Sequence, residues 1–142
     1  AFTFSKPNIP GLNFSFSGLK TGILYFVQKN IEENPNFITE HLADICASVQ
    51  HTIVEILMSK LKKAVKETGI KQVAIGGGVS ANSGIRNALT ALGQQYGWQT
   101  FVPKFQYCTD NAAMIGIVGY HKFLEGNFVA QEVTAQARLS FN

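Results

Sequence analysis

Three consecutive glycines at positions 76–78 follow a short apolar run, Val-Ala-Ile at 73–75, and precede a predicted helix. A backbone without side chains can approach a ligand closely, and the unpaired N–H groups where a helix begins favour an anion such as phosphate. The same arrangement also serves as a tight turn that packs a helix onto a sheet, and the glycines alone favour neither use. The chemistry that this segment could support is therefore nucleotide binding.

Two nucleotide-binding patterns overlap at this turn. Gly76, Gly78 and Ala81 fit the dinucleotide pattern G-x-G-x-x-G/A. That pattern also requires an acidic residue at the end of the next strand, and positions 101–104 (Phe-Val-Pro-Lys) provide none. No Gly-Lys-Ser/Thr follows the turn, so a P-loop is absent. The better match is the stretch 77–80 (Gly-Gly-Val-Ser), which resembles the adenosine-contacting turn of the actin, hexokinase and heat-shock ATPase superfamily.

Three polar side chains near the predicted helix starts have two uses each. Asn82 can cap the helix that follows the turn, which is the common role, or donate a hydrogen bond to a nucleotide. Arg86, one turn further on, could reach a phosphate, although such a side chain is more commonly solvated. Asp110 stands where the last helix is predicted to begin, and by position alone a capping carboxylate is the favoured interpretation.

The elements that position these residues follow from hydrophobic periodicity and from helix-ending glycines. After a short extended segment at 14–17, the predicted elements are helix 18–30, helix 39–68 with Thr39 as N-cap and Gly69 after its end, strand 71–75, helix 83–96, strand 98–102 and a helix from 109 or 110 to 125. The last helix is apolar almost all round, so we expect it to be buried. The order strand, helix, strand, helix predicts an α/β fold with parallel strands, and residues 1–142 form a single unit.

Composition excludes several classes of protein. Hydrophobic residues make up 46% of the chain and charged residues 15%, which indicates a globular core rather than a disordered tail. The net charge is only +3, and the densest basic run (Lys60, Lys62, Lys63, Lys66) favours a solvated helix face over an RNA contact. Cys46 and Cys108 form no C-x-x-C pair, so we expect no zinc knuckle and two reduced, buried thiols of a cytoplasmic protein. No apolar run reaches the ~18 residues of a membrane span.

Three segments occur in a characteristic order: Phe-Ser-Phe-Ser-Gly-Leu-Lys-Thr at 14–21, Gly-Gly-Gly-Val-Ser-Ala-Asn at 76–82 and Cys-Thr-Asp-Asn-Ala-Ala-Met-Ile at 108–115. Together they resemble the carboxyl-terminal part of the tRNA adenosine threonylcarbamoyltransferases, a family also described as O-sialoglycoprotein endopeptidases. The resemblance implies one lobe of a two-lobed fold like that of actin, hexokinase and Hsp70. It also implies transfer of a threonylcarbamoyl group from threonylcarbamoyl-adenylate to the adenosine beside a tRNA anticodon.

The family pattern carries over to four residues. It implies that Gly77, Gly78 and Asn82 bind ATP or threonylcarbamoyl-adenylate, and that Asp110 is one ligand of a divalent metal ion, iron or else zinc. The segment 14–19 receives no assigned contact. The two histidines of the family's H-x-x-x-H motif are missing from the chain. We therefore expect this chain to be catalytically inactive alone and to form the nucleotide- and metal-binding lobe of a longer protein.

The three histidines of the chain are no substitute ligands. His121 follows Asp110 by eleven residues, which is about 16 Å along a helix, whereas such ligands lie about 2 Å from the ion. His41 and His51 are ten residues apart on one predicted helix and meet the same objection. All three are expected to be surface or partly packed side chains.

The resemblance also names partners: tRNA, an inactive paralogue and a small ATPase of the same pathway, with no membrane. Surface normally covered by the rest of the protein favours a homodimer of the isolated chain. One alternative is a non-catalytic nucleotide-binding module. The metalloprotease of the older description is disfavoured, because neither H-E-x-x-H nor G-x-S-x-G is present.

Overall fold

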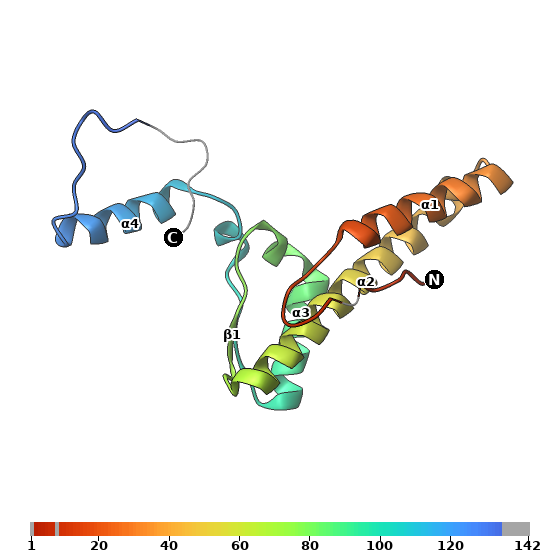
Figure 1. The fold of residues 1–142 in the computed structure, drawn as a ribbon, viewed down its shortest axis with the longest axis horizontal. Helices are drawn as coiled ribbons and strands as arrows, with labels where there is room; N and C mark the ends of the chain where they lie inside the picture. The colour runs from red at the N-terminus through yellow and green to blue at the C-terminus, as the bar shows by residue number, and fades with distance from the viewer. Residues whose placement is uncertain (1, 8, 135–142) are drawn as a thin grey trace. The chain divides into compact units, whose positions relative to one another are not determined.

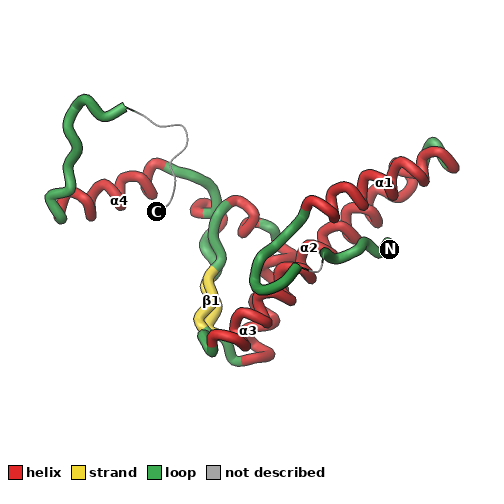
Figure 2. Tube along the Cα trace, in the orientation of Figure 1, coloured by secondary structure: helices red, strands yellow, loops and turns green. Residues whose placement is uncertain are grey.

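The computed structural model describes residues 2–7 and 9–134. These residues form two units, the first ending at Cys108 and the second beginning at Thr109, and each is described by itself. The elements of the first unit are α1 (Ser17–Glu33), α2 (Phe37–Thr68), β1 (Gln72–Ala74), the 3-10 turn η1 (Gly78–Ala81), α3 (Ser83–Tyr96), β2 (Gln99–Phe101) and the 3-10 turn η2 (Phe105–Tyr107) (Figures 1 and 2). The second unit contains α4 (Ala112–Leu124).

The helices α1 and α2 pack side by side as a hairpin (Figure 1). Leu19 of α1 and Ile56 of α2 are buried in one apolar cluster with Phe4 of the amino-terminal segment. Burying each of these side chains contributes roughly 1.5–3 kcal/mol. The predicted N-cap of α2 at Thr39 is wrong, because the helix begins at Phe37. Phe37 is itself buried and packs edge-on against Phe26, at 5.8 Å between ring centroids. This packing explains why the helix begins two residues earlier than predicted.

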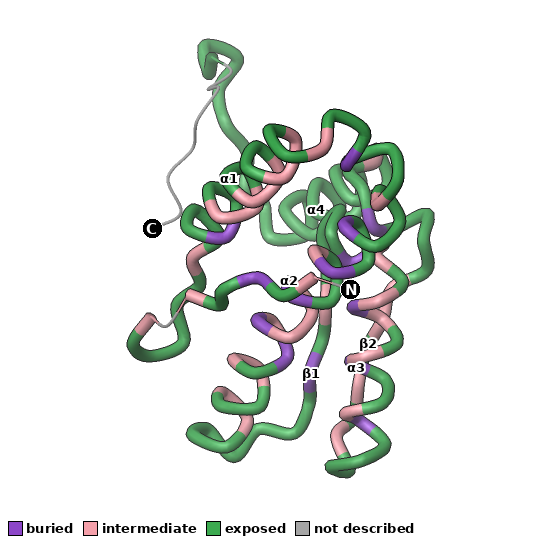
Figure 3. Tube along the Cα trace, turned by 90° about the vertical axis from the view of Figure 1, so that its right-hand side faces the viewer, coloured by how far each residue is buried: buried purple, intermediate pink, exposed green. Residues whose placement is uncertain are grey.

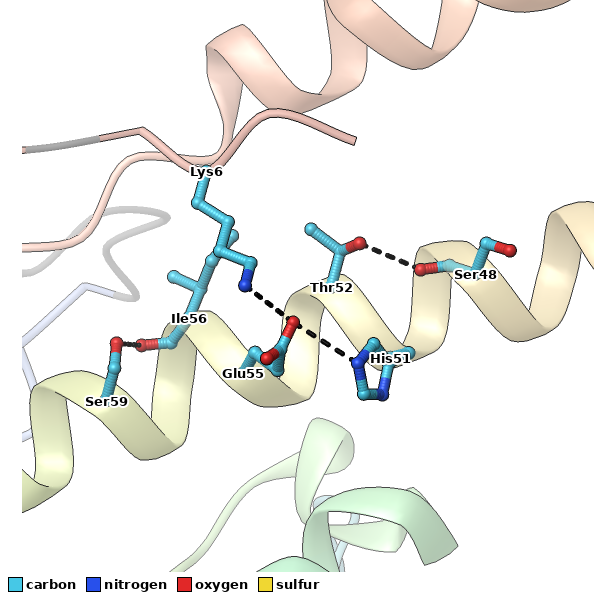
Figure 4. Close-up of polar contacts among 7 residues, drawn as sticks. All are labelled: Lys6, Ser48, His51, Thr52, Glu55, Ile56 and Ser59. Atoms are coloured by element: carbon cyan, nitrogen blue, oxygen red, sulfur yellow. Dashed lines mark hydrogen bonds and ion pairs between the residues drawn. The ribbon is translucent and has the colours of Figure 1, made fainter. Parts of the chain in front are cut away.

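Residues 2–7 and 9–11 run along α2 and are bound to it through polar contacts. The backbone N–H of Phe2 donates to Ser48 Oγ at 2.8 Å, and Lys60 Nζ donates to the carbonyls of Ile9 and Gly11 at 2.6 and 2.9 Å. Lys6 and Glu55 form an ion pair of 2.7 Å (Figure 4). Lys60 of the basic run on α2 thus binds backbone carbonyls of the same chain.

The helix α2 contributes residues to two apolar clusters, one with α1 and one with α3. Ser48 and Thr52 are buried, and each hydroxyl donates to a carbonyl one turn back. Figure 4 shows the bond from Thr52 to the Ser48 carbonyl. Gly69 ends the helix in the left-handed conformation, φ 73°, as predicted.

The strands β1 and β2 pair in parallel, with Val73 opposite Thr100, which confirms the predicted parallel pair. Each strand has three residues and is shorter than predicted. The helix α3 connects them and runs over the predicted span 83–96. Its Leu89 is fully buried in a core with Met58 and Val73. Close packing on β2 requires Gly93, where an added Cβ would lie 2.7 Å from Thr100 Cγ2.

The expectation that the last helix is buried is wrong: every residue of α4 is exposed, Ile115 to 77% (Figure 3). Burial needs a facing surface, and among the residues described in the second unit this surface is the segment that follows α4, where Phe128 lies 5.9 Å from Phe123 between ring centroids. The helix also begins at Ala112, later than predicted. No helix among the described residues is long and apolar enough to cross a membrane.

The α/β class with short parallel strands is confirmed. The assignment to an actin-like ATPase lobe stays a prediction. That residues 1–142 form a single unit also stays a prediction, because it depends on how the two described units sit together.

Candidate functional site

The glycine turn between β1 and α3 has one strained position and two open ones. Gly77 adopts φ 79° and ψ 173°, a region that is essentially restricted to glycine. At Gly76 and Gly78 an added Cβ would meet nothing within 4 Å, and neither has a positive φ. Within this turn, the backbone conformation therefore requires glycine only at Gly77. At the other two positions the missing side chains leave open surface over the backbone.

Polar groups of this turn are not all used by the fold. Ser80 N donates to the Gly77 carbonyl at 3.0 Å, whereas the N–H groups of Gly76, Gly77 and Gly78 make no hydrogen bond within the described part of the chain. Ser80 is 3% exposed, and its hydroxyl is buried without a partner among the described residues. Buried polar groups without partners are uncommon and call for a ligand or solvent partner.

Asn82 links the turn to both neighbouring helices. Its Oδ1 accepts from Ile85 N at 3.1 Å, so it caps α3, and its Nδ2 donates to Gln50 Oε1 of α2 at 3.1 Å. Gly84 makes room for this pair, since an added Cβ would lie 3.0 Å from Gln50 Nε2. A side-chain amide has two N–H donors, so one remains beyond the bond to Gln50.

Asn82 lines a cavity of about 320 Å³ between α2, the glycine turn and α3. Cys46 lines the same cavity and is exposed, which corrects the expectation that both thiols are buried; Cys108 is buried as predicted. Cys46 is exposed because its helix passes an open cavity at this point rather than a packed neighbour.

A second cavity, of about 600 Å³, lies on the other side of Val79. Its lining is almost wholly apolar and is formed by Phe16, Leu19, Lys20, Ile23, Ile53, Leu57 and Val79. The rings of Phe14 and Phe16 stack at 6.3 Å and are 49% and 39% exposed. The structure thus brings the segment at the start of α1 to the glycine turn, although the two are about 60 residues apart in the sequence.

Arg86 of α3 is neither solvated nor free to serve mainly as a phosphate ligand. Its guanidinium donates to the Ser80 carbonyl at 3.0 Å, the Pro103 carbonyl at 2.6 Å and Cys108 Sγ at 3.7 Å. It also lies over the ring of Phe105, 4.3 Å from the centroid.

Asp110 belongs to the second unit and is exposed. The interpretation of Asp110 as a helix cap is wrong: Asn111 caps α4, accepting from Met114 N at 3.2 Å. The carboxylate of Asp110 therefore makes no capping hydrogen bond to α4. The family resemblance implies that Asp110 and Asn82 lie in one cleft, and this is a prediction, because each unit is described by itself.

A metal site needs more ligands than Asp110. Among the described residues no group of three or more His, Cys, Asp or Glu side chains could hold a metal ion. His51 lies 3.3 Å from Glu55 Oε2 on α2, and His41 packs on Phe37 at 4.9 Å. The predicted surface or partly packed histidines are confirmed for His41, His51 and His121.

The chain matches the family model described as TsaD, tRNA N6-adenosine threonylcarbamoyltransferase, over residues 1–117. The chain belongs to this threonylcarbamoyltransferase family. Proteins of that name from three bacteria are similar to it. The protein of Christiangramia forsetii is 64% identical over 141 residues, that of Cytophaga hutchinsonii 52% over 139 and that of Riemerella anatipestifer 52% over 142.

These alignments cover 99%, 98% and 100% of the chain but only 42%, 40% and 42% of the relatives. The chain therefore spans about two fifths of the threonylcarbamoyltransferases it matches.

The sequence predicts the turn and Asn82 as site residues but does not predict the residues that contact them, Gln50 and Gly84. Gln50 sits in a 32-residue helix where no local pattern distinguishes it from other exposed polar residues. Gly84, one position after the start of α3, was the available signal, because glycine inside a helix is unfavourable unless close packing requires it.

Proposed function

We propose that this chain is the nucleotide-binding lobe of a tRNA N6-adenosine threonylcarbamoyltransferase and supplies one ligand of its metal centre. The reaction class is supported by the activity for which the family and its relatives are named. The observation that carries the assignment within the chain is the open glycine turn beside Asn82.

The nucleotide is ATP or threonylcarbamoyl-adenylate. Its phosphate approaches the backbone at Gly77 and Gly78, where N–H groups are unpaired and no side chain intervenes. The remaining N–H donor of Asn82 binds the nucleotide, and the cavity beside it, with Val79 exposed at its rim, provides apolar surface for a base or ribose.

The metal is iron, or else zinc, and Asp110 is one of its ligands. An exposed carboxylate that the fold does not use suits either ion as a single donor, but no further donors accompany it among the described residues. The remaining ligands come from outside this chain. When bound, the ion would orient and polarise the carbamoyl group of the adenylate.

In the reaction the N6 amine of adenosine attacks the carbamoyl carbon. The bond from this carbon to the phosphate oxygen breaks, the nitrogen loses a proton and AMP leaves. The contribution of this chain is to hold the adenylate so that AMP is a bound leaving group, a positioning role. tRNA is the acceptor, and the inactive paralogue and small ATPase are partners of the complete enzyme in the cytoplasm.

The experiment is threonylcarbamoyl transfer to tRNA by the full-length protein and by its Asp110→Ala variant. We expect the variant to lose at least about 100-fold in turnover, because a metal-assisted step loses a ligand. The isolated chain is expected to be inactive and to lose metal on dialysis. Unchanged turnover by Asp110→Ala, or stoichiometric metal retained by the isolated chain, would contradict the proposal. A non-catalytic nucleotide-binding module would bind ATP without any transfer.

A further inference from the structure

Arg86 joins two stretches of backbone on either side of α3. One is the glycine turn, through the carbonyl of Ser80, and the other is the segment 103–108, through the Pro103 carbonyl, the Phe105 ring and Cys108 Sγ. A guanidinium presents several donors in one plane, so it can fix both segments at once. Of the described residues, no other charged side chain donates hydrogen bonds to both segments.

The second of these segments leads directly to the proposed metal ligand. Cys108 is 2% exposed, and Asp110 follows it by two residues. Two residues of extended chain span at most about 7 Å between Cα atoms. Fixing Cys108 therefore limits where the backbone of Asp110 can lie.

We propose that Arg86 is a positioning residue, which couples the nucleotide-binding turn to the segment that carries Asp110. This inference rests on the proposed function. Arg86 does not touch the reacting atoms; it holds Ser80 and Cys108 in one arrangement, so that binding at the glycine turn and binding at Asp110 stabilise each other.

The geometry distinguishes this role from a direct phosphate contact. Three hydrogen bonds and the Phe105 ring occupy most of the guanidinium, and its two hydrogen-bonding nitrogens face protein acceptors. Lysine keeps the charge but presents one ammonium group in place of a planar fork, so we expect Arg86→Lys not to reproduce the contacts to Ser80, Pro103 and Cys108 together. A phosphate contact would be largely retained by lysine, whereas the coupling would not.

The test measures the affinity of the full-length protein for ATP with and without Zn²⁺, for the wild type, Arg86→Lys and the control Asn87→Ala. Asn87 is the exposed neighbour of Arg86 on α3. We expect Zn²⁺ to tighten ATP binding at least about 5-fold in the wild type and in Asn87→Ala, within the usual range of coupling between sites. In Arg86→Lys the ratio should fall to about 1. Turnover should fall at least about 10-fold with the KM for tRNA unchanged.

A second variant, Phe105→Leu, keeps the test informative if Arg86→Lys does not fold. It removes the ring under the guanidinium but keeps apolar bulk, and we expect a ratio between those of the wild type and Arg86→Lys. A merely structural role would lower the melting temperature and leave the ratio intact. The inference is overturned if Arg86→Lys or Phe105→Leu folds and keeps the wild-type ratio, or if the wild type shows no coupling. Absence of ATP binding by the wild type would overturn the proposed function as well.

Discussion

The side chain of Asn82 donates to Gln50 Oε1 at 3.1 Å while it accepts from Ile85 N at 3.1 Å. One amide thus fixes the start of α3 to the middle of α2, across 32 residues of sequence. Asn82 thus fixes the end of the glycine turn that leads into α3, while the backbone at Gly76 and Gly78 remains accessible. A rigid frame around an open turn is what preorganised binding of a small ligand requires.

Two substitutions distinguish the capping role of Asn82 from its proposed role in binding the nucleotide. Asn82→Ala removes the cap and should cost about 1 kcal/mol of stability, whereas Asn82→Ser restores a capping oxygen and should cost little. Both lose the amide donor, so both should weaken ATP binding by about 10-fold, the usual worth of one or two hydrogen bonds. Thermal unfolding and calorimetric titration of the full-length protein measure the two effects. ATP affinity that follows stability, with Asn82→Ser equal to the wild type, would show that Asn82 is only a cap.

The glycines of the turn should respond differently to alanine. Gly77→Ala forces a Cβ into a backbone region reserved for glycine and should destabilise the protein by about 1–3 kcal/mol. Gly78→Ala meets open space in the chain's own fold, so its stability should change by no more than about 1 kcal/mol while ATP binding weakens. Denaturant unfolding with ATP titration checks both. Normal ATP affinity of Gly78→Ala would remove that glycine from the binding surface.

The sequence predicted those features of the fold that neighbouring residues in the sequence determine. The span of α3 followed from Asn82 before it and Gly97 after it, both of which act as predicted in the structure. The parallel pair followed from two short apolar runs joined by that helix. The start of α2 did not follow, because burial of Phe37 against α1 decides it and no local pattern shows which aromatic side chain will be buried.

Nonlocal contacts account for the rest of the differences. An apolar pattern predicts that α4 needs a covering surface, but it cannot say that this surface lies within the chain. For the site, the sequence predicted Asn82 but not its partner Gln50, and it left Arg86 between solvent and phosphate. The actual partners of Arg86 are carbonyls, which any residue provides and which leave no trace in the sequence.

The attachment of residues 2–7 to α2 should depend on pH. The hydrogen bond from Lys6 to Glu55 lowers the pKa of this carboxyl, and the charges of Lys6, His51 and Lys62 act in the same direction, against the effect of burial. A lowered pKa in the folded state means that the stabilisation is complete above the ordinary value of 4.5 and is lost as pH falls through the lower, folded-state pKa.

Hydrogen exchange of the Phe2 amide, which donates to Ser48, reports this attachment. We expect its protection to decrease in acid in the wild type and to be smaller, with little pH dependence in that range, in Glu55→Gln. Lys66→Gln is a control, because this lysine lies on α2 away from Glu55 in the sequence. The same acid response in Glu55→Gln as in the wild type would exclude the Lys6–Glu55 pair as its cause.

Metal content should depend on Asp110 without any change in α4. Because Asn111 caps that helix, Asp110→Asn should keep its helicity, whereas Asn111→Ala should weaken it by about 1 kcal/mol. Elemental analysis of the full-length protein should show at least about 10-fold weaker metal retention in Asp110→Asn. Full occupancy in that variant would exclude Asp110 as a ligand.

The most direct test of the account is the structure of the full-length protein with ATP and its metal ion. The account predicts that the nucleotide lies on the backbone of Gly77 and Gly78 with Asn82 Nδ2 donating to it, and that Asp110 coordinates the ion in the same cleft. A nucleotide bound elsewhere, or a carboxylate of Asp110 directed away from both ligands, would contradict it.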